Sequence, residues 1–398
     1  MKKDGVLAGV TVLDLTRVLD GPFCGLLLAD MGAEVIKIEV PGTGDDSRQY
    51  GPFRNGESVY YMNFNRGKLG CTLNLKSPEG KEILKEMVKK ADLLIENYRP
   101  GTMEKLGLGY DVLKEVNPAL VYGAVSGFGH TGPYSRRAGY DIVGQAVGGL
   151  MSTTGWPGGE PTRTGTPMGD VLGGLNLTIG VLAALFRARA TGKGDKVDVS
   201  LVDSVVSSMA NVNMIYLADG RIPQRIGNRY ESTYPYDSFR TSDGSVIIGA
   251  GNDKLFGMLC ALMGCPELKS DARFLTVADR VARHAELKEI IERWSLQYTV
   301  DEVADMLNAA GIPGCAINSI DRVVVDPQIA GVRNMFPELD HPVAGKLRLT
   351  NNALKFSGAN NDPETPAPTL GQDNDRVYGS FLGYDAEKRA RLKADGVI

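Results

Sequence analysis

The chain lacks the residue patterns of a metal centre or a disulfide framework. Its five cysteines contain no CxxC pair, and its three histidines form no cluster with metal-ligand spacing. We therefore expect no metal, no disulfides and a reducing compartment, the cytoplasm. No apolar run approaches the ~18 residues of a membrane span, and no signal peptide follows the two N-terminal lysines. A membrane partner is therefore not expected.

Nucleotide and hydrolase signatures are missing as well. The sequence contains no GxxxxGK[ST] loop, no GxSxG elbow and no GxGxxG after its first predicted strand. Its net charge of −4 gives no electrostatic reason to expect nucleic acid as a partner. These absences argue against a dinucleotide enzyme, an ATP enzyme and a serine hydrolase.

What the sequence does contain is the alternating pattern of an α/β protein. In its first half, short β-branched runs alternate with helical stretches, which predicts a parallel sheet with helices on both faces. The predicted strands are Val10–Leu15, Val35–Glu39, Leu69–Leu75, Leu93–Glu96 and Leu120–Ser126. Ligands of such sheets bind at the carboxyl ends of the strands, where this chain has its polar loops.

The pattern changes after a predicted helix over Leu201–Leu217. A chain of 398 residues exceeds what one hydrophobic core usually supports. The segment Asp219–Ser238 is irregular and is interpreted as a linker. The strands and helices expected after it, among them a helix over His284–Trp294, indicate a second, smaller α/β domain.

The most informative residue is Asp170, in the glycine-rich stretch from Thr164 to Gly174. The apolar and small residues Val171–Leu185 predict a buried helix with Asp170 in or near its first turn. A carboxylate there faces free N–H groups and the positive end of the helix dipole. Such an aspartate is most often an ordinary N-cap. However, the glycines leave room for a reactive atom to approach, which makes Asp170 a candidate nucleophile.

Basic side chains gather at the predicted strand ends. Lys76 closes one strand, Arg99 and Lys105 follow another, and Arg48 and Arg137 lie in neighbouring loops. Each of them alone is an ordinary surface charge. Together, at one sheet edge, they could bind a phosphate-bearing polyanion.

Taken in order, these segments resemble the class III coenzyme A transferases, the CaiB/BaiF family that includes formyl-CoA transferase. The matching segments have the family's order and spacing and extend to Gly371-Gln372. They are Val12–Thr16 with Gly21-Pro22, Gly32–Glu39, Gly44–Arg48, Leu73–Lys76, Glu96–Gly101, Ser126–Pro133, Gly139–Asp141 and Gly169-Asp170.

The resemblance implies a Rossmann-like large domain built from residues 1–218 and a C-terminal segment, residues 331–398. Residues 219–330 would form the linker and the small α/β domain, and two subunits would interlock as a homodimer. Acyl-CoA would be a substrate, and no cofactor would be bound permanently. The positions that match the family's CoA contacts are Val18, Leu19, Leu73, Lys76, Asn97, Tyr98, Arg99, Lys105, Arg137, Tyr140 and Asp141.

The resemblance also implies a reaction. Asp170 would attack an acyl-CoA to give an aspartyl anhydride and then an aspartyl-CoA thioester, from which CoA passes to a second acid. Acetyl-, succinyl- or formyl-CoA would be the donor, and the acceptor would be a small carboxylic acid, with a dicarboxylate such as oxalate favoured. Arg48, Tyr50 and Gly169 are candidates for the substrate pocket, and Arg48 or Arg225 could pair the second carboxylate.

Two departures from the family pattern weaken a formyl-CoA assignment. Leu19 stands where formyl-CoA transferase has a glutamine, and the glycine loop that covers its nucleophile is absent. Two alternatives stay open, an α-methylacyl-CoA racemase-type epimerase and a non-catalytic acyl-CoA binding protein. The racemases use a His-Asp pair, whereas this chain has Tyr140-Asp141, and a tyrosine with a pKa near ~10 is a poor base at neutral pH.

Overall fold

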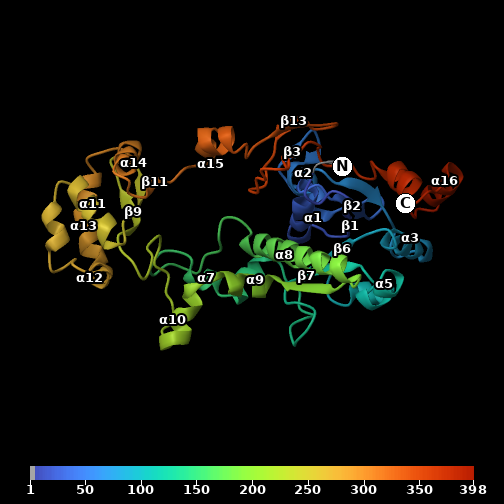
Figure 1. Ribbon diagram of the computed structural model, residues 1–398, viewed down its shortest axis with the longest axis horizontal. Coiled ribbons are helices and arrows are strands. Elements are labelled where there is room, and N and C mark those ends of the chain that lie inside the picture. Colours follow the sequence, from blue (N-terminus) through green and yellow to red (C-terminus); the bar gives the residue numbers. More distant parts are fainter. Residues whose placement is uncertain (1–4) are drawn as a thin grey trace. The chain divides into compact units, whose positions relative to one another are not determined.

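The computed structural model describes residues 5–398, which form two compact units (Figure 1). The larger unit holds the chain up to Leu150, together with Arg163–Gly220 and Pro327–Ile398. The smaller unit holds Met151–Thr162 and Arg221–Asp326.

Six strands form the sheet of the larger unit, in the order β5-β2-β1-β6-β7-β8. They are β1 (Thr11–Asp14), β2 (Glu34–Glu39), β5 (Leu69–Thr72), β6 (Leu93–Glu96), β7 (Val121–Ser126) and β8 (Lys196–Ser200). Every neighbouring pair is parallel, so the predicted α/β fold with a parallel sheet is confirmed. The strand order reverses between β1 and β6, and the crevice at such a switch point is where open sheets bind ligands.

Helices cover both faces of this sheet because successive strand residues point to opposite sides. Val12 is buried in a cluster with Leu177, whereas its neighbour Leu13 is buried in a second cluster with Leu84. The helices that supply these clusters are α1 (Asp20–Asp30) and α8 (Met168–Thr191) on one face, and α3 (Pro78–Val88), α5 (Tyr110–Val116) and α16 (Ala386–Ala394) on the other. Helix α3 begins directly after Ser77, which caps it by accepting from the Gly80 N–H at 2.9 Å.

Helix α8 corrects one expectation. By length and composition its 24 residues could cross a membrane, so the prediction that no run approaches a membrane span is wrong. In the structure α8 packs along α1, β7 and β8, as Figure 1 shows. Its buried residues Leu177, Val181 and Leu185 belong to the core beneath the sheet.

The helix predicted over Leu201–Leu217 is interrupted. It forms α9 (Leu201–Ser208) and α10 (Asn211–Asp219), which meet at 77°. Between them Ala210 has a φ of 46°, a left-handed conformation that cannot continue an α-helix. The apolar residues on both sides of the break continue the same pattern, so the break could not be predicted from the sequence.

The smaller unit has a separate core. Its antiparallel sheet has the order β11-β10-β9, with β9 (Tyr236–Arg240), β10 (Ser245–Gly249) and β11 (Gly314–Ala316). Buried side chains of α11 (Asp253–Leu262), α13 (His284–Ser295) and α14 (Val300–Ala309) pack against this sheet. Both tryptophans of the chain, Trp156 and Trp294, lie in this unit.

The C-terminal segment closes one edge of the large sheet. The Gly70 N–H of β5 donates to the Asp373 carboxylate at 2.8 Å, and the Thr72 N–H donates to the Asn374 side chain at 2.9 Å. Tyr378 is buried in the core beside this strand. These contacts satisfy donors that an exposed edge strand would leave open.

Candidate active site

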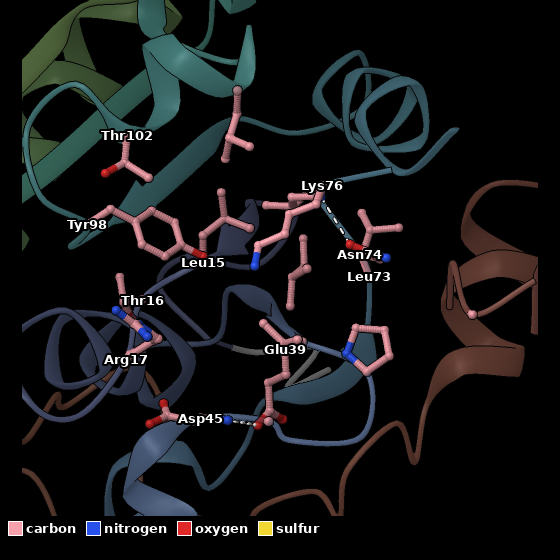
Figure 2. Close-up of a pocket in the computed structure, with 17 residues that line it drawn as sticks. Leu15, Thr16, Arg17, Glu39, Asp45, Leu73, Asn74, Lys76, Tyr98 and Thr102 are labelled. Carbon is pink, nitrogen blue, oxygen red and sulfur yellow. Dashed lines mark hydrogen bonds between the residues drawn. The ribbon is translucent and has the colours of Figure 1, made fainter. Parts of the chain in front are cut away.

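A cavity of about 550 Å³ lies at the carboxyl ends of four strands (Figure 2). Its wall includes Thr16 after β1, Glu39 at the end of β2, Leu73 after β5 and Tyr98 after β6. This is where open parallel sheets bind ligands, and the volume is in the range of small-molecule sites. We call it the strand-end cavity.

A second cavity of about 90 Å³ contains Asp170, and we call it the Asp170 cavity. Arg17 belongs to the walls of both cavities, so the two adjoin at this side chain. Sequence reasoning missed Arg17. Its position directly after the first predicted strand, at a ligand-binding strand end, was the signal that could have identified it.

Most of the residues predicted from the sequence to contact CoA lie in these two walls. Leu73, Lys76 and Tyr98 line the strand-end cavity, and Val18, Leu19, Asn97 and Tyr140 line the Asp170 cavity. Figure 2 shows Lys76 extending from its strand end into the larger cavity.

Three of the predicted basic contacts line neither cavity. Arg99, Lys105 and Arg137 are exposed. Lys105 lies on the short helix α4 (Thr102–Leu106), both ends of which line the strand-end cavity, so it stands at the rim. Arg137 is stacked over the Tyr134 ring at 3.6 Å.

The predicted substrate-pocket residues are held in different ways. Arg48 makes two hydrogen bonds to Glu39, at 2.7 and 2.8 Å, and lines neither cavity. Arg225 belongs to the smaller unit and donates to the Ser152 carbonyl. Tyr50 is 43% exposed and makes an edge contact with the Tyr60 ring.

Asp170 lies in the first turn of α8, as predicted. The turn is held by Asp141, whose Oδ1 accepts from the Gly169 N–H at 2.7 Å and whose Oδ2 accepts from the Gln145 side chain at 2.8 Å. A Cβ at position 169 would stand 3.1 Å from Asp141, so glycine permits this approach. Asp141 therefore accepts from N–H groups of the helix start that an N-cap side chain would otherwise bind.

No residue in the described part of the chain donates a hydrogen bond to the Asp170 carboxyl, and Asp170 does not act as an N-cap. A side chain that only capped the helix would be bonded to its N–H groups. The carboxyl of Asp170 is instead directed to a cavity with its oxygens available for a reaction. This observation favours the nucleophile interpretation over the cap.

Glycines of α8 bring a second carboxyl, that of Asp20, to the same cavity. Asp170, Gly173 and Gly174 lie on one face of the helix because they are three and four residues apart. A Cβ at Gly174 would stand 2.5 Å from the Asp20 carbonyl oxygen. Only glycine therefore lets the N-terminus of α1 come this close to α8. The space beside these glycines is filled by other parts of the chain, and not left open for a reactive atom as expected from the sequence.

The two carboxyls are electrostatically unfavourable neighbours. Burial raises the pKa of Asp20 to about 6, although the Asn97 side chain and the Gly21 N–H favour its charged form. Burial, the Asp20 charge and the Asp141 charge raise the pKa of Asp170 to about 8. Asp170 is thus harder to ionise than an ordinary aspartate. Sequence reasoning missed Asp20, because its role depends on a helix contact far away in sequence.

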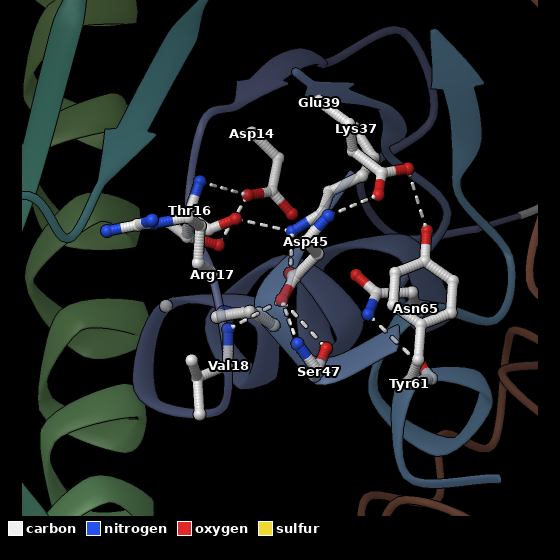
Figure 3. A network of polar contacts seen from close by, with 12 residues as sticks. Asp14, Thr16, Arg17, Val18, Lys37, Glu39, Asp45, Ser47, Tyr61 and Asn65 are labelled. Atoms are coloured by element: carbon white, nitrogen blue, oxygen red, sulfur yellow. Dashed lines mark hydrogen bonds and ion pairs between the residues drawn. The ribbon is translucent and has the colours of Figure 1, made fainter. Parts of the chain in front are cut away.

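The loop between β1 and α1 forms part of both walls and is held by the buried carboxylate of Asp45 (Figure 3). Asp45 accepts from the Val18 N–H at 3.1 Å, from the Ser47 hydroxyl at 2.8 Å and from the Lys37 ammonium at 2.8 Å. Lys37 also donates to the Thr16 carbonyl. Val18 has a φ of 68°, which a β-branched residue rarely adopts, so these bonds fix a strained backbone.

The charge left open in the strand-end cavity is positive. Its two acidic wall residues, Glu39 and Asp45, are paired with Arg48 and Lys37. Lys76 is exposed, and no acidic side chain within residues 5–398 pairs with it. A phosphate-bearing ligand would therefore meet an available cation here.

Known proteins are similar to this chain in both sequence and fold. A model described as CoA-transferase family III matches residues 7–374. An acetyl-CoA:oxalate CoA-transferase of Acetobacter aceti is 39% identical over 97% of this chain and 98% of its own length. The human succinyl-CoA:glutarate CoA-transferase is 37% identical over 98% of this chain and 90% of its own length. The crystal structure of a CAIB/BAIF family protein from Brucella suis has a TM-score of 0.83 at 38% identity, covering 95% of this chain and 99% of that one.

Proposed function

Since the chain belongs to CoA-transferase family III and is a CoA-transferase, we propose that it transfers CoA to a small dicarboxylic acid with Asp170 as the nucleophile. The observation that carries the proposal is the Asp170 carboxyl, which accepts no hydrogen bond from any of residues 5–398 and faces a cavity adjoining the strand-end cavity. Acetyl- or succinyl-CoA is the favoured donor and oxalate or glutarate the favoured acceptor, because the relatives above are named for these substrates.

The proposed reaction runs through two covalent states of Asp170. Its carboxylate oxygen attacks the acyl carbon of the donor, the C–S bond breaks, and CoA leaves as the thiolate. The thiolate then attacks the aspartyl carbonyl of the anhydride, and the donor acid leaves as its carboxylate. The acceptor carboxylate reverses these steps. Holding the reactants aligned can supply ~7–11 kcal/mol of the barrier reduction.

The two cavities suit the two ends of an acyl-CoA. The phosphates would lie in the strand-end cavity near Lys76, and the thioester would pass Arg17 to reach Asp170. Leu19 has no polar side chain, so backbone N–H groups would stabilise the oxyanion. The bound substrates would have to displace water from the Asp170 cavity, because water would hydrolyse the anhydride.

Trapping with hydroxylamine tests the nucleophile directly. Incubation of the enzyme with acetyl-CoA and hydroxylamine is expected to leave a hydroxamate on Asp170, located by peptide mass spectrometry. A label on another residue, or none with any donor, would contradict the scheme.

A substrate matrix tests the acceptor and the alternatives together. Formyl-, acetyl- and succinyl-CoA are each assayed against oxalate, glutarate, mesaconate and carnitine-type acids, and transfer to a dicarboxylate is expected to be fastest. Deuterium uptake at the α-carbon of a methyl-branched acyl-CoA, without transfer to any acid, would instead indicate an epimerase. Binding of acyl-CoA with neither reaction would indicate a binding protein.

Replacement of Lys76 by alanine is expected to raise the KM for acyl-CoA about tenfold or more, with little change in kcat, because one charge-assisted contact to phosphate is lost. Steady-state kinetics at two salt concentrations measures this, and the difference should shrink at high salt. Lys89→Ala, an exposed lysine beyond α3, is the matched control. Equal KM values for Lys76→Ala and Lys89→Ala would remove Lys76 from the CoA site.

A further inference from the structure

Asp20 is a buried carboxyl without a role in the reaction written above. It is 9% exposed and lines the same cavity as Asp170. Its Oδ1 accepts from the Asn97 side chain and from the Gly21 N–H, both at 2.6 Å. Within residues 5–398 no lysine or arginine pairs with it. A buried carboxylate with only neutral donors keeps an uncompensated negative charge.

The other groups that face Asp170 are better compensated or neutral. Asp141 is bound by N–H groups at the start of α8 and by Gln145. Asp46 is 54% exposed and pairs with Arg17 at 3.1 Å. Burial and then the Asp170 charge raise the pKa of Tyr60, so this hydroxyl stays neutral. Tyr140, the remaining titratable group of the cavity wall, is 73% exposed to solvent.

We propose that Asp20 is a positioning residue for the nucleophile: its carboxylate opposes negative charge on free Asp170, and acylation of Asp170 removes that opposition. Asp20 thereby favours the covalent states of the enzyme over the free one. The inference rests on the proposed function, in which Asp170 is acylated.

The charge balance of the steps explains why the effect has this direction. Asp170 carries one negative charge before attack and none as the anhydride or thioester. The charge leaves first with the CoA thiolate and then with the donor carboxylate. A fixed negative neighbour therefore raises the free energy of the free anionic enzyme but not that of its covalent forms. A stronger neighbouring negative charge therefore shifts the equilibrium further toward the covalent forms.

Two measurements on Asp20→Asn test the inference, with Asp46→Asn as the matched control in the same cavity wall. The acidic limb of the kcat/KM profile for acetyl-CoA reports the ionisation of free Asp170. It is expected to move down by about one pH unit in Asp20→Asn and by less than ~0.3 in Asp46→Asn. At pH 9 the ratio of aspartyl-CoA thioester to free enzyme, measured by intact-protein mass spectrometry, is expected to fall about tenfold in Asp20→Asn only.

The outcomes separate this inference from the proposed function. If the wild-type enzyme forms no adduct on Asp170 with any acyl-CoA, the proposed function fails. If it forms the adduct but Asp20→Asn keeps the wild-type limb and thioester ratio, the Asp20 inference alone is overturned. Should Asp20→Asn lose its fold by circular dichroism, Asp20→Ala, which also removes the charge, takes its place. A limb that moves down by about one pH unit in that variant supports the inference, and a limb at the wild-type value overturns it.

Discussion

An Asp170→Asn variant is expected to lose CoA transfer by about 10⁴-fold or more, because an amide cannot form the anhydride on which both covalent steps depend. The assay is transfer from acetyl-CoA to the best acceptor of the substrate matrix. Asp203→Asn, an exposed carboxylate on α9, is the matched control and should keep its activity. Near-normal turnover of Asp170→Asn would reduce Asp170 to a structural residue.

The same variant is expected to be more stable than the wild type at pH 8. The pKa of Asp170 is raised in the folded chain, first by burial, to about 8, so the unfolded chain releases this proton at lower pH. The free energy of unfolding therefore falls between pH 4 and pH 8 in the wild type, and asparagine removes this loss. Melting temperatures at pH 5 and pH 8 should diverge in favour of Asp170→Asn as the pH rises. A variant that is equally destabilised at both values would contradict the electrostatic explanation.

Replacement of Lys37 by methionine is expected to lower the free energy of unfolding by about 3–5 kcal/mol, because it leaves the Asp45 carboxylate buried without a cation. Both side chains of this pair are 0% exposed. Burial opposes the ionisation of Asp45, yet the Lys37 charge and its hydrogen bond hold the pKa of Asp45 well below its ordinary value. That stabilisation is present above pH 4 and is lost as the pH falls, so the difference between the two proteins should shrink in acid.

The Lys37 variant should also lose activity. Without its cation, Asp45 holds the Val18 backbone less firmly, and relaxation of this loop alters both cavity walls. We expect kcat/KM to fall about tenfold, as small misplacements near a reacting centre cost that much or more. Urea unfolding followed by far-UV circular dichroism gives the stability. Lys85→Met breaks a surface pair with Glu82 and should cost no more than ~1 kcal/mol. Equal costs for the two variants would contradict the role of the buried network.

Much of the fold could be predicted from the sequence because strands buried on both faces consist of short apolar runs, many of them rich in β-branched residues. Leu93–Glu96 is predicted and observed with the same bounds. The break at Ala210 could not be predicted, since nothing in its composition marks a left-handed residue. The expectation that no segment is long and apolar enough to span a membrane was wrong because of α8. A helix that packs between a sheet and other helices can be as apolar as a membrane span.

The cavity walls could be predicted where their residues lie in segments that match the family, and not where only the fold brings two residues together. Asp170 is recognisable from its glycines and the apolar helix after it. Arg48 was predicted to reach the substrate, but its partner Glu39 ends a strand nine residues earlier, and only the fold brings the two together. Asp20 belongs to α1, so its influence on Asp170 depends on how two helices far apart in the sequence meet.

The placement of the two tryptophans has a practical consequence. Trp156 and Trp294 both belong to the smaller unit, and the parallel sheet with its buried ion pairs contains none. Intrinsic tryptophan fluorescence therefore does not report on the larger unit, which contains Lys37 and Asp170. A denaturation curve recorded by tryptophan emission would report the unfolding of the smaller unit. A variant that destabilises only the larger, Rossmann-like unit could then show an unchanged curve. An indole introduced at Tyr50 would give the larger unit a reporter of its own.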